Sequence, residues 1–512
     1  MHHVRGIDRD QIRMISLEQM VEKDSMARVI DAFVEMLDLE ELGFSYYKLN
    51  KEGRPPFHPG TMVKIFFYGY QNGIRSCRKL EAACKLNVEM MWLVQGQQPH
   101  YKTIANFRKN NPESFKKTFR YFVAILKEWK LVDGKTIAID SFKIRAQNSL
   151  KNNFNERKVK RHLDYIDKKI AEYEEELDKE FNQDIEDKLV KIENKKELYL
   201  DVRRSLQESG DGQMSTTDPD SRAVVFQRNS VKVGYNIQAA SDSKHKLLIA
   251  AETGDVNDTK SLALMVEKSQ ANLSMASKKI NVLADKGYHS GRELRACEEL
   301  NVKSYISPKE SSSVKQNPAF AMESFKYYSR SDTYQCPAGE RLRTNGRWYN
   351  KKLLHGRKSY QVKHYKTKAC KDCLLRTDCT TNKLGRTIER TEYAAYITRN
   401  NDRVNKNPEY YRQRQQLIEH QFGTLKRHQH FDYTLMRGKQ KVLTEVFIAF
   451  TMYNLRRSMS ILGIIGLFKR MKAVSLRIFD KLDLTYVIRA LDGLKIFNHR
   501  SLCATSCGLV RN

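Results

Sequence analysis

This sequence lacks a long apolar run, a signal peptide and a paired set of cysteines. Its longest apolar stretch, Ile461 to Phe468, falls far short of the ~20 residues that a membrane-spanning helix needs. Residues 1–6 contain no apolar core of the kind that directs export. The nine cysteines are odd in number and scattered over 512 residues, which is typical of reduced thiols in an intracellular protein. We therefore expect a cytoplasmic protein with no membrane segment.

The charge balance is strongly basic. Lys and Arg total 91 against 61 Asp and Glu, a formal net charge of +30. Such an excess favours nucleic acid as a partner, because basic side chains neutralise phosphates and release their counterions. The alternative is a basic protein whose charges are merely solvated. The length fits about three domains of ordinary size, and a hydrophobic fraction of 40% allows each to bury a core.

Residues 1–130 have a helical and basic pattern. Ser76 and Asn87 are candidate N-caps of two short helices, a spacing that resembles a helix-turn-helix. A longer helix is predicted from Pro112, with an apolar stripe that steps by three and four residues. The members of that stripe are Phe115, Phe119, Phe122, Leu126 and Trp129. We predict an all-α DNA-binding domain here, although a helical bundle with a solvated basic face would give the same pattern.

Strand and helix patterns alternate after Gly134, with two interruptions. The expected strands are a segment ending at Asp140, a hairpin at 231–237 and 247–251, a strand at 280–285 and one at 304–307; the expected helices lie at 258–273, 290–300 and 442–457. This order indicates one mixed sheet flanked by helices over residues 131–460. The interruptions are a densely charged helical arm at 155–208 and a cysteine-rich insertion at 308–395. The basic tail, 461–512, receives no assignment.

Three carboxylates stand out. Asp140 and Asp285 each follow a short apolar run, and Glu419 lies on a late helix. Carboxylates delivered from two strand ends and a helix can hold two divalent metal ions, which cut or join phosphodiester bonds. The alternative for each aspartate is a turn or cap residue. Glu445, on the next helix, is the rival to Glu419 but lacks its flanking motif.

Two further aspartates and four cysteines are also considered as site residues. Asp255 and Asp258 follow a glycine and are interpreted as turn and helix-cap residues. The cysteines have the spacing C-x33-C-x2-C-x5-C, with one knuckle-like pair, and four thiolates can complete a tetrahedral structural zinc site. They are Cys336, Cys370, Cys373 and Cys379. Reduced thiols without metal in an insertion remain the alternative.

Several stretches, in order, resemble the DDE-type transposases of bacterial insertion sequences, over about residues 15–460. They are Gly53 to Pro59 before an apolar helix, Asp140 to Lys143, Thr217 to Arg222, Gly234 to Gln238, Ala284 to Tyr288, and Glu419 to Arg427. The resemblance implies an RNase H-like catalytic domain and Mg²⁺-dependent (or Mn²⁺-dependent) cleavage and strand transfer at the element's own ends. It also implies a homodimer on DNA, in the bacterial nucleoid.

The resemblance also assigns roles to single residues. Asp140 would bridge both metal ions, while Asp285 and Glu419 would each hold one. Lys426 would contact a DNA phosphate, and Lys286 and His289 are further candidate DNA contacts. Two alternatives stay open: a catalytically silent DNA-binding relative, and a stand-alone nuclease that cleaves without strand transfer.

One part of the family pattern is broken. Many such transposases have Tyr, two residues, Arg, three residues, Glu, six residues and Lys. Glu419 and Lys426 fit, but Gln415 stands at the Arg position and Arg412 at the Tyr position.

The residues expected by the pattern occur one place too early. Tyr411 and Arg414 precede their family positions by one residue, which rotates a helical side chain by about 100°. Arg412 lies seven residues before Glu419 and shares its helix face. We therefore expect Arg412 to supply the missing cation, and Tyr411 and Arg414 receive no role.

Overall fold

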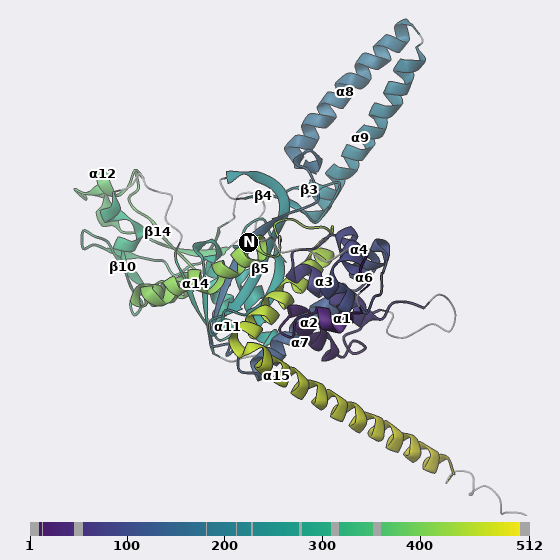
Figure 1. Cartoon of the computed structure of the whole chain (residues 1–512). Coiled ribbons are helices and arrows are strands. Elements are labelled where there is room, and N and C mark those ends of the chain that lie inside the picture. Colours follow the sequence, from purple (N-terminus) through teal and green to yellow (C-terminus); the bar gives the residue numbers. More distant parts are fainter. Residues whose placement is uncertain are drawn as a thin grey trace, which may run out of the picture. The chain divides into compact units, whose positions relative to one another are not determined.

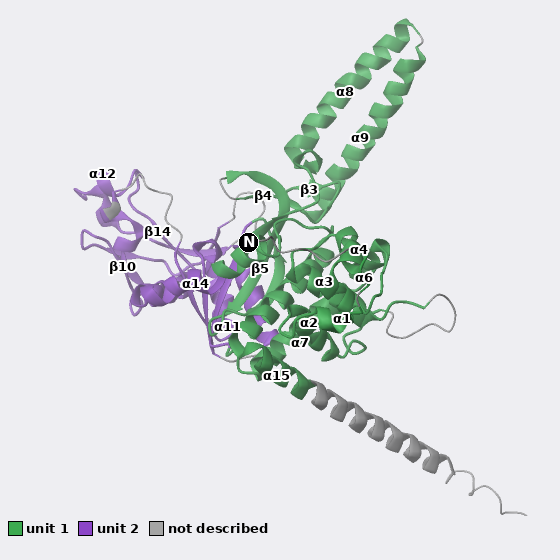
Figure 2. Ribbon diagram, in the orientation of Figure 1, with its two compact units in different colours: residues 1–133, 141–256, 419–512 green, residues 134–140, 257–418 purple. Residues whose placement is uncertain are grey.

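The computed structural model describes residues 10–12, 14–45, 55–180, 182–210, 212–226, 229–275, 279–308, 317–351 and 360–501. The chain divides into two compact units, coloured separately in Figure 2. The first contains residues 1–133, 141–256 and 419–512, and the second contains residues 134–140 and 257–418.

The first unit begins with a helical region (Figure 1). Phenylalanines are buried in its interior. Its helices are α1 Leu17–Met20, α2 Met26–Glu35, α3 Pro59–Gln71, α4 Cys77–Leu86, α5 Val88–Leu93, α6 Tyr101–Asn110 and α7 Pro112–Glu128. The stripe predicted along α7 is buried throughout, so that prediction is confirmed. Phe33 of α2 meets Phe122 of α7 edge to face at 4.7 Å between ring centroids, a favoured aromatic geometry.

The two short helices expected around Ser76 and Asn87 are present as α4 and α5. Ser76 is the N-cap of α4 by position but makes no side-chain cap bond. The Asn87 side chain accepts a hydrogen bond from the Met90 N–H at 2.8 Å, which satisfies one of the free donors at the start of α5.

The sheet of the first unit consists of β4 Arg222–Val225, β5 Val231–Asp242, β6 Leu248–Gly254 and the second half of β1 Thr136–Arg145. The β4–β5 and β5–β6 pairs are antiparallel. The order is β4-β5-β1, with β6 also paired to β5. The β5–β6 pair confirms the predicted hairpin. The strand β4 was not predicted, because its four residues are too few to show an alternating pattern.

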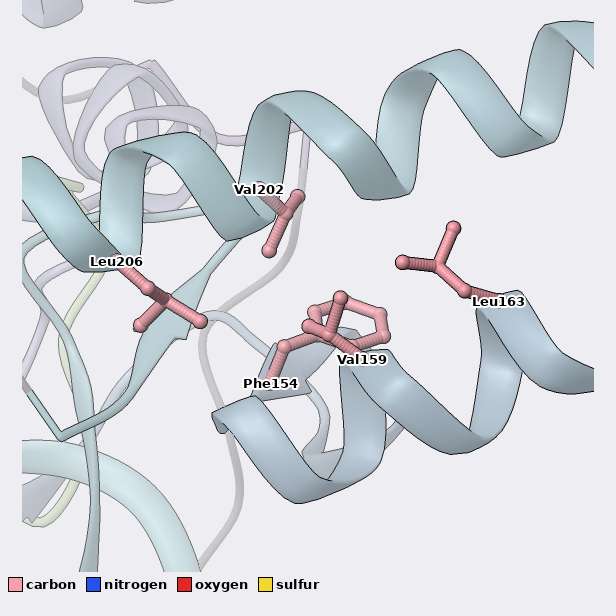
Figure 3. Packing of buried hydrophobic residues seen from close by; sticks show 5 residues of the cluster. All are labelled: Phe154, Val159, Leu163, Val202 and Leu206. Carbon is pink, nitrogen blue, oxygen red and sulfur yellow. The ribbon is translucent and has the colours of Figure 1, made fainter.

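The charged segment at 155–208 forms two long helices, α8 Glu156–Lys179 and α9 Gln183–Ser209, which lie side by side in Figure 1. Side chains from both helices meet at the base of this arm (Figure 3). The cluster consists of Phe154, Val159, Leu163, Val202 and Leu206. Phe154 belongs to β2 Asn153–Phe154, which pairs with β3 Met214–Ser215 where the arm ends. A two-stranded ribbon and a small apolar core therefore hold the arm's base together.

The helix α15 Lys439–Ser501 closes the first unit. Its backbone is non-helical at Gly463, where φ is 68°. The Asn454 amide both accepts from the Leu248 N–H (2.9 Å) and donates to the Leu248 carbonyl (2.7 Å). This pair of bonds fixes α15 to the edge of β6. Among the described residues, none of the helices has the unbroken apolar length that a membrane span requires.

The second unit is built on parallel strands: the first half of β1, β7 Ile280–Ala284 and β8 Val302–Ile306, in the order β1-β7-β8. Its helices are α10 Leu262–Asn272, η3 Lys286–Tyr288, α11 Gly291–Glu299, α13 Ala394–Lys406 and the larger part of α14 Pro408–Arg427. Antiparallel pairing in one unit and parallel pairing in the other confirm the predicted mixed α/β class.

The cysteine-rich insertion forms two small antiparallel sheets in the second unit. Its elements are η4 Pro318–Phe320, η5 Met322–Ser324, β9 Lys326–Tyr328, β10 Thr333–Gln335, β11 Arg341–Arg343, β12 Tyr349–Lys351, β13 Tyr360–Tyr365, η6 Lys368–Lys371, α12 Arg376–Cys379 and β14 Ile388–Thr391. One sheet has the order β11-β10-β9 and the other β12-β13-β14.

Candidate active site

Asp140 lies on β1, and Asp285 directly follows β7, its parallel neighbour in the second unit. The last register pair between β1 and β7 is Ile139 with Ala284, and the two aspartates are the next residues along the chain. Parallel strands deliver such residues to the same level of the sheet. The side chain of Asp140 is 17% exposed, so its carboxylate is largely withdrawn from water. The structure thus brings together the two aspartates that the sequence singled out.

The position of Asp140 within its strand differs from the prediction. We expected the strand to end there, but β1 continues to Arg145. Phe142 and Ile144 are 4% and 0% exposed, so the two-residue alternation of a buried strand runs straight past Asp140. Asp140 is therefore held by extended backbone on both sides.

Asp285 is held by its own backbone. It is the N-cap of η3, and its Oδ1 accepts from the Gly287 N–H at 2.5 Å. A Cβ added at Gly287 would lie 3.6 Å from that oxygen and 3.5 Å from Oδ2 of Asp258. Asp258 was interpreted as a helix cap, but the N-cap of α10 is Ser261. The Asp258 carbonyl accepts from the Ser261 N–H at 3.2 Å, so Asp258 lies in the turn before the helix. Its carboxylate nevertheless lies beside the Asp285 turn, a neighbour that chain spacing gave no means to predict.

Arg414 on α14 lies beside Asp140. Its Nη1 lies 3.3 Å from Oδ2 of Asp140, and its side chain is only 13% exposed. One turn earlier, the Tyr410 hydroxyl lies 2.7 Å from Thr136 Oγ1 on β1 and accepts from Asn281 Nδ2 on β7 at 3.0 Å. Residues four apart share a helix face, so Tyr410 and Arg414 together dock α14 across both strands.

The sequence assigned no role to Arg414, yet it is an arginine that lies beside Asp140. Arg412, which the sequence favours, has a side chain that is 73% exposed and pairs with Glu409 at 2.6 Å. The signal that could have found Arg414 is its four-residue spacing from Tyr410. The family pattern is counted back from Glu419 and places its Tyr and Arg at 412 and 415, so it did not point to Tyr410 and Arg414.

Glu419 and Lys426 lie on the last two turns of α14, in the first unit. Glu419 is exposed, and the seven-residue spacing places Lys426 on its face. The Lys426 ammonium lies 5.9 Å from the centre of the Phe142 ring. Burial lowers the pKa of Lys426, an effect that Asp432 opposes and Lys143 reinforces.

The remaining predicted contacts flank Asp285. Lys286 is exposed in η3, and His289, at its C-cap, is half-buried. Within the described ranges, no three His, Cys, Asp or Glu side chains converge closely enough to hold a metal ion as placed.

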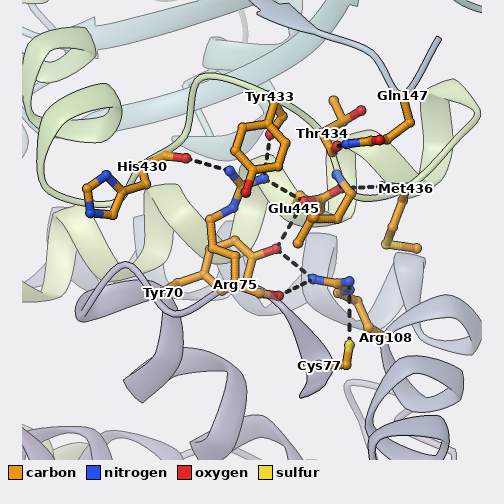
Figure 4. A network of polar contacts seen from close by, with 11 residues as sticks. Tyr70, Arg75, Cys77, Arg108, Gln147, His430, Tyr433, Thr434, Met436 and Glu445 are labelled. Carbon is orange, nitrogen blue, oxygen red and sulfur yellow. Dashed lines mark hydrogen bonds and ion pairs between the residues drawn. The ribbon is translucent and has the colours of Figure 1, made fainter. Parts of the chain in front are cut away.

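The surroundings of Glu445 exclude it as a metal ligand, because its carboxylate is enclosed by hydrogen-bonding partners (Figure 4). Its side chain is fully buried and pairs with Arg75 at 2.8 Å. Its other oxygen accepts from the N–H groups of Leu435 and Met436 at 2.9 and 2.8 Å. The Tyr70 hydroxyl donates at 3.3 Å to the oxygen that is paired with Arg75. These bonds occupy both oxygens, so Glu445 is a structural residue.

Arg75 completes this buried network within the first unit. Its guanidinium donates to the carbonyls of His430 and Tyr433, both at 2.6 Å. Arg108, also buried, donates to the Tyr70 hydroxyl at 3.1 Å. Burial and then the Glu445 carboxylate raise the pKa of Tyr70 to about 12. The network therefore ties α3 and α6 to the segment before α15.

Comparison with known proteins decides the family. The model "Transposase domain (DUF772)" matches residues 15–110, and the model "Transposase DDE domain" matches residues 211–455. The chain belongs to the DDE transposases. The two matches cover about two thirds of it, and they confirm the predicted RNase H-like catalytic fold and the activity of a DNA transposase.

Other comparisons add less. No curated protein matches the sequence. Among solved structures, the transposase is similar to piggyBac transposase, determined by cryo-electron microscopy in a synaptic complex with hairpin DNA. The identity is 9%, the alignment covers 88% of this chain and 79% of that one, and the TM-score is 0.32. At that score the likeness carries no conclusion about this fold.

Proposed function

We propose that the transposase binds Mg²⁺ with Asp140, Asp285 and Glu419 and cuts and joins DNA at the ends of its own element. The main support is the placement of Asp140 and Asp285 directly after the last register pair of two parallel strands. An oxygen-only set of carboxylates is what Mg²⁺ prefers, and Mn²⁺ accepts the same ligands. When bound, such ions activate the attacking oxygen and stabilise the leaving oxygen of a phosphodiester.

The chain's own cations have separate tasks in this proposal. Arg414 offsets the charge of Asp140, which reduces the repulsion between two neighbouring carboxylates. Lys426 would bind a DNA phosphate, because a half-buried ammonium regains favourable interactions when an anion approaches it. Lys286, His289 and Arg412 are proposed as further DNA contacts. The net charge of +30 supports DNA as the partner for all of them.

The test is a cleavage and strand-transfer assay on DNA that carries the sequences flanking the gene. It compares Mg²⁺, Mn²⁺ and EDTA, with and without a target plasmid. We expect joined product with either metal ion and none with EDTA. Cleaved ends that never join the target would favour a nuclease, and binding without cleavage would favour a silent relative.

Arg414 gives the first specific prediction. Replacing Arg414 by Ala should slow cleavage about 10²-fold, the usual effect of losing one charged group beside the reacting phosphate. DNA binding, measured separately by anisotropy, should weaken far less. Arg412→Ala is the matched control on the same helix and should cleave nearly as well as the wild type. If Arg412→Ala lost cleavage and Arg414→Ala kept it, the family-spacing hypothesis would be restored.

We further propose that the working form is a homodimer and that the arm contributes to it. Large apolar side chains on α8 and α9 are exposed: Tyr165 by 59%, Val190 by 51% and Leu198 by 53%. Buried in a partner they would be stabilising. Replacing all three by serine leaves the core at the arm's base intact, so the hairpin should still fold.

The measurement is mass by light scattering. We expect the wild type to weigh about twice the 59.8 kDa of one chain and the triple variant to weigh about half of that dimer. Leu86→Ser on α4, where the side chain is 81% exposed, is the matched control and should remain dimeric. A triple variant that keeps the dimer mass would show that the arm is not the interface.

A further inference from the structure

The cysteine-rich insertion has a very small core of its own. Its hydrophobic cluster has five buried members, namely Phe325, Tyr334, Leu342, Tyr365 and Ile388. Its two sheets consist of short strands, most of only three residues. Modules with so little buried apolar surface usually need a disulfide or a metal ion to hold them together. The cysteines in this insertion are free thiols.

Four of those thiols line a single cavity. Cys336, Cys370, Cys373 and Cys379 all contribute to its wall, together with apolar residues that include Phe320 and Leu375. Each of the four is half-buried. In the described part of the chain, no Asp, Glu or His side chain lines this cavity. The tertiary structure thus brings Cys336 to the other three across a separation of more than thirty residues.

Tight turns present these cysteines to the cavity. Cys336 begins a turn in which its carbonyl accepts from the Gly339 N–H and its own N–H donates to the Glu340 carbonyl, both at 2.9 Å. Cys370 lies in η6. The Cys373 carbonyl accepts from the Arg376 N–H at 3.2 Å, and Cys379 ends α12. Chain turns around cysteines are how metal knuckles are built.

Gly385 supports the same site. Its φ is +89°, and a Cβ there would lie 2.5 Å from Cβ of Cys370 and 3.3 Å from its sulfur. A side chain at 385 would therefore push Cys370 out of the wall. The backbone at position 385 comes so close to Cys370 that only glycine fits there.

From this convergence we propose that Cys336, Cys370, Cys373 and Cys379 bind one structural Zn²⁺ ion that stabilises the insertion. A set of four thiols without carboxylates suits zinc and does not suit Mg²⁺. As placed, the sulfurs line the wall without meeting at coordination distance. Rotation about the Cα–Cβ bonds would bring them inward, and each thiol would release its proton to the solvent as its zinc–sulfur bond forms.

The test is the metal content of the full-length transposase, purified with a reductant and without chelators, by inductively coupled plasma mass spectrometry. We expect about one zinc per chain. Cys370→Ser and Cys379→Ser should lose it. The matched controls, Cys84→Ser and Cys297→Ser, replace buried cysteines outside the insertion and should keep it. Asp285→Asn should also keep it, which separates this site from the proposed catalytic one.

A second measurement covers the case of variants that fail to fold. Wild-type protein stripped of metal and reduced is titrated with Co²⁺, which should give the absorption bands of tetrahedral thiolate coordination and be displaced by Zn²⁺. Gly385→Ala should weaken zinc retention in competition with a chelator by about tenfold. Zinc retained in Cys370→Ser, iron in place of zinc, or no Co²⁺ uptake by the reduced wild type would each overturn the proposal.

Discussion

Asp285→Asn is expected to reduce strand cleavage by more than about 10³-fold while leaving binding to end DNA nearly unchanged. A lost metal ligand removes several kcal/mol of transition-state stabilisation, and each 1.36 kcal/mol is a factor of ten in rate. Asparagine is chosen because its amide oxygen can still accept from the Gly287 N–H, as Oδ1 of Asp285 does at 2.5 Å. The substitution therefore removes the charge and keeps the turn.

Asp140→Asn and Glu419→Gln should show losses of the same size, because the proposal gives each carboxylate its own metal contact. The measurement is single-turnover cleavage over a range of Mg²⁺ concentrations, with binding followed by anisotropy. Glu409→Gln is the matched control: Glu409 lies on the same helix as Glu419 and is 81% exposed. Full cleavage by Asp285→Asn would reduce Asp285 to the turn residue that was its alternative interpretation.

Asp258→Asn tests whether Asp258 is a metal ligand or only a neighbour of Asp285. The Asp258 carboxylate lies beside Gly287, yet the proposal assigns it no metal. We expect cleavage within a few-fold of the wild type at saturating Mg²⁺. A loss as large as that of Asp285→Asn would add Asp258 to the catalytic carboxylates.

The second large effect concerns stability. Glu445→Ala is expected to lower the free energy of unfolding by about 3–5 kcal/mol, because it leaves the buried Arg75 guanidinium without its counter-ion. The side chains of Arg75 and Glu445 are only 3% and 0% exposed, so water cannot replace the lost partner. The loss also frees the N–H groups of Leu435 and Met436, whose hydrogen bonds go to Glu445.

Urea unfolding followed by circular dichroism measures this effect. The matched control is Glu175→Ala, which breaks an ion pair with Lys179 whose two side chains are both 71% exposed; we expect a change below about 0.5 kcal/mol. The double variant Arg75→Met, Glu445→Ala should lose less than the sum of the two single variants, because it leaves no unpaired buried charge. An unchanged midpoint in Glu445→Ala would contradict the role given to this network.

Local pattern was enough to find many of the elements. The stripe of α7, the β5–β6 hairpin, the helices of the arm and the strand before Asp285 all follow from periodicity and capping, which act between residues a few places apart. The same local patterns marked Asp140 and Asp285 as candidates. Phe142 and Ile144 continue the alternation of β1, so the sequence also contains a signal for its full length. We nevertheless expected the strand to end at Asp140, because aspartate is uncommon inside a strand.

By itself, then, the sequence determined the family, the element order and the carboxylates to examine, because these depend on residue type and short spacing. The tertiary structure alone decided which arginine reaches Asp140. Arg412 and Arg414 differ by two places, and the docking of Tyr410 on β1 and β7 helps to turn Arg414 toward Asp140. It also decided that Glu445 is a buried counter-ion and that Cys336 joins three distant cysteines. Those outcomes depend on contacts between residues far apart in the chain, whose geometry no local spacing encodes.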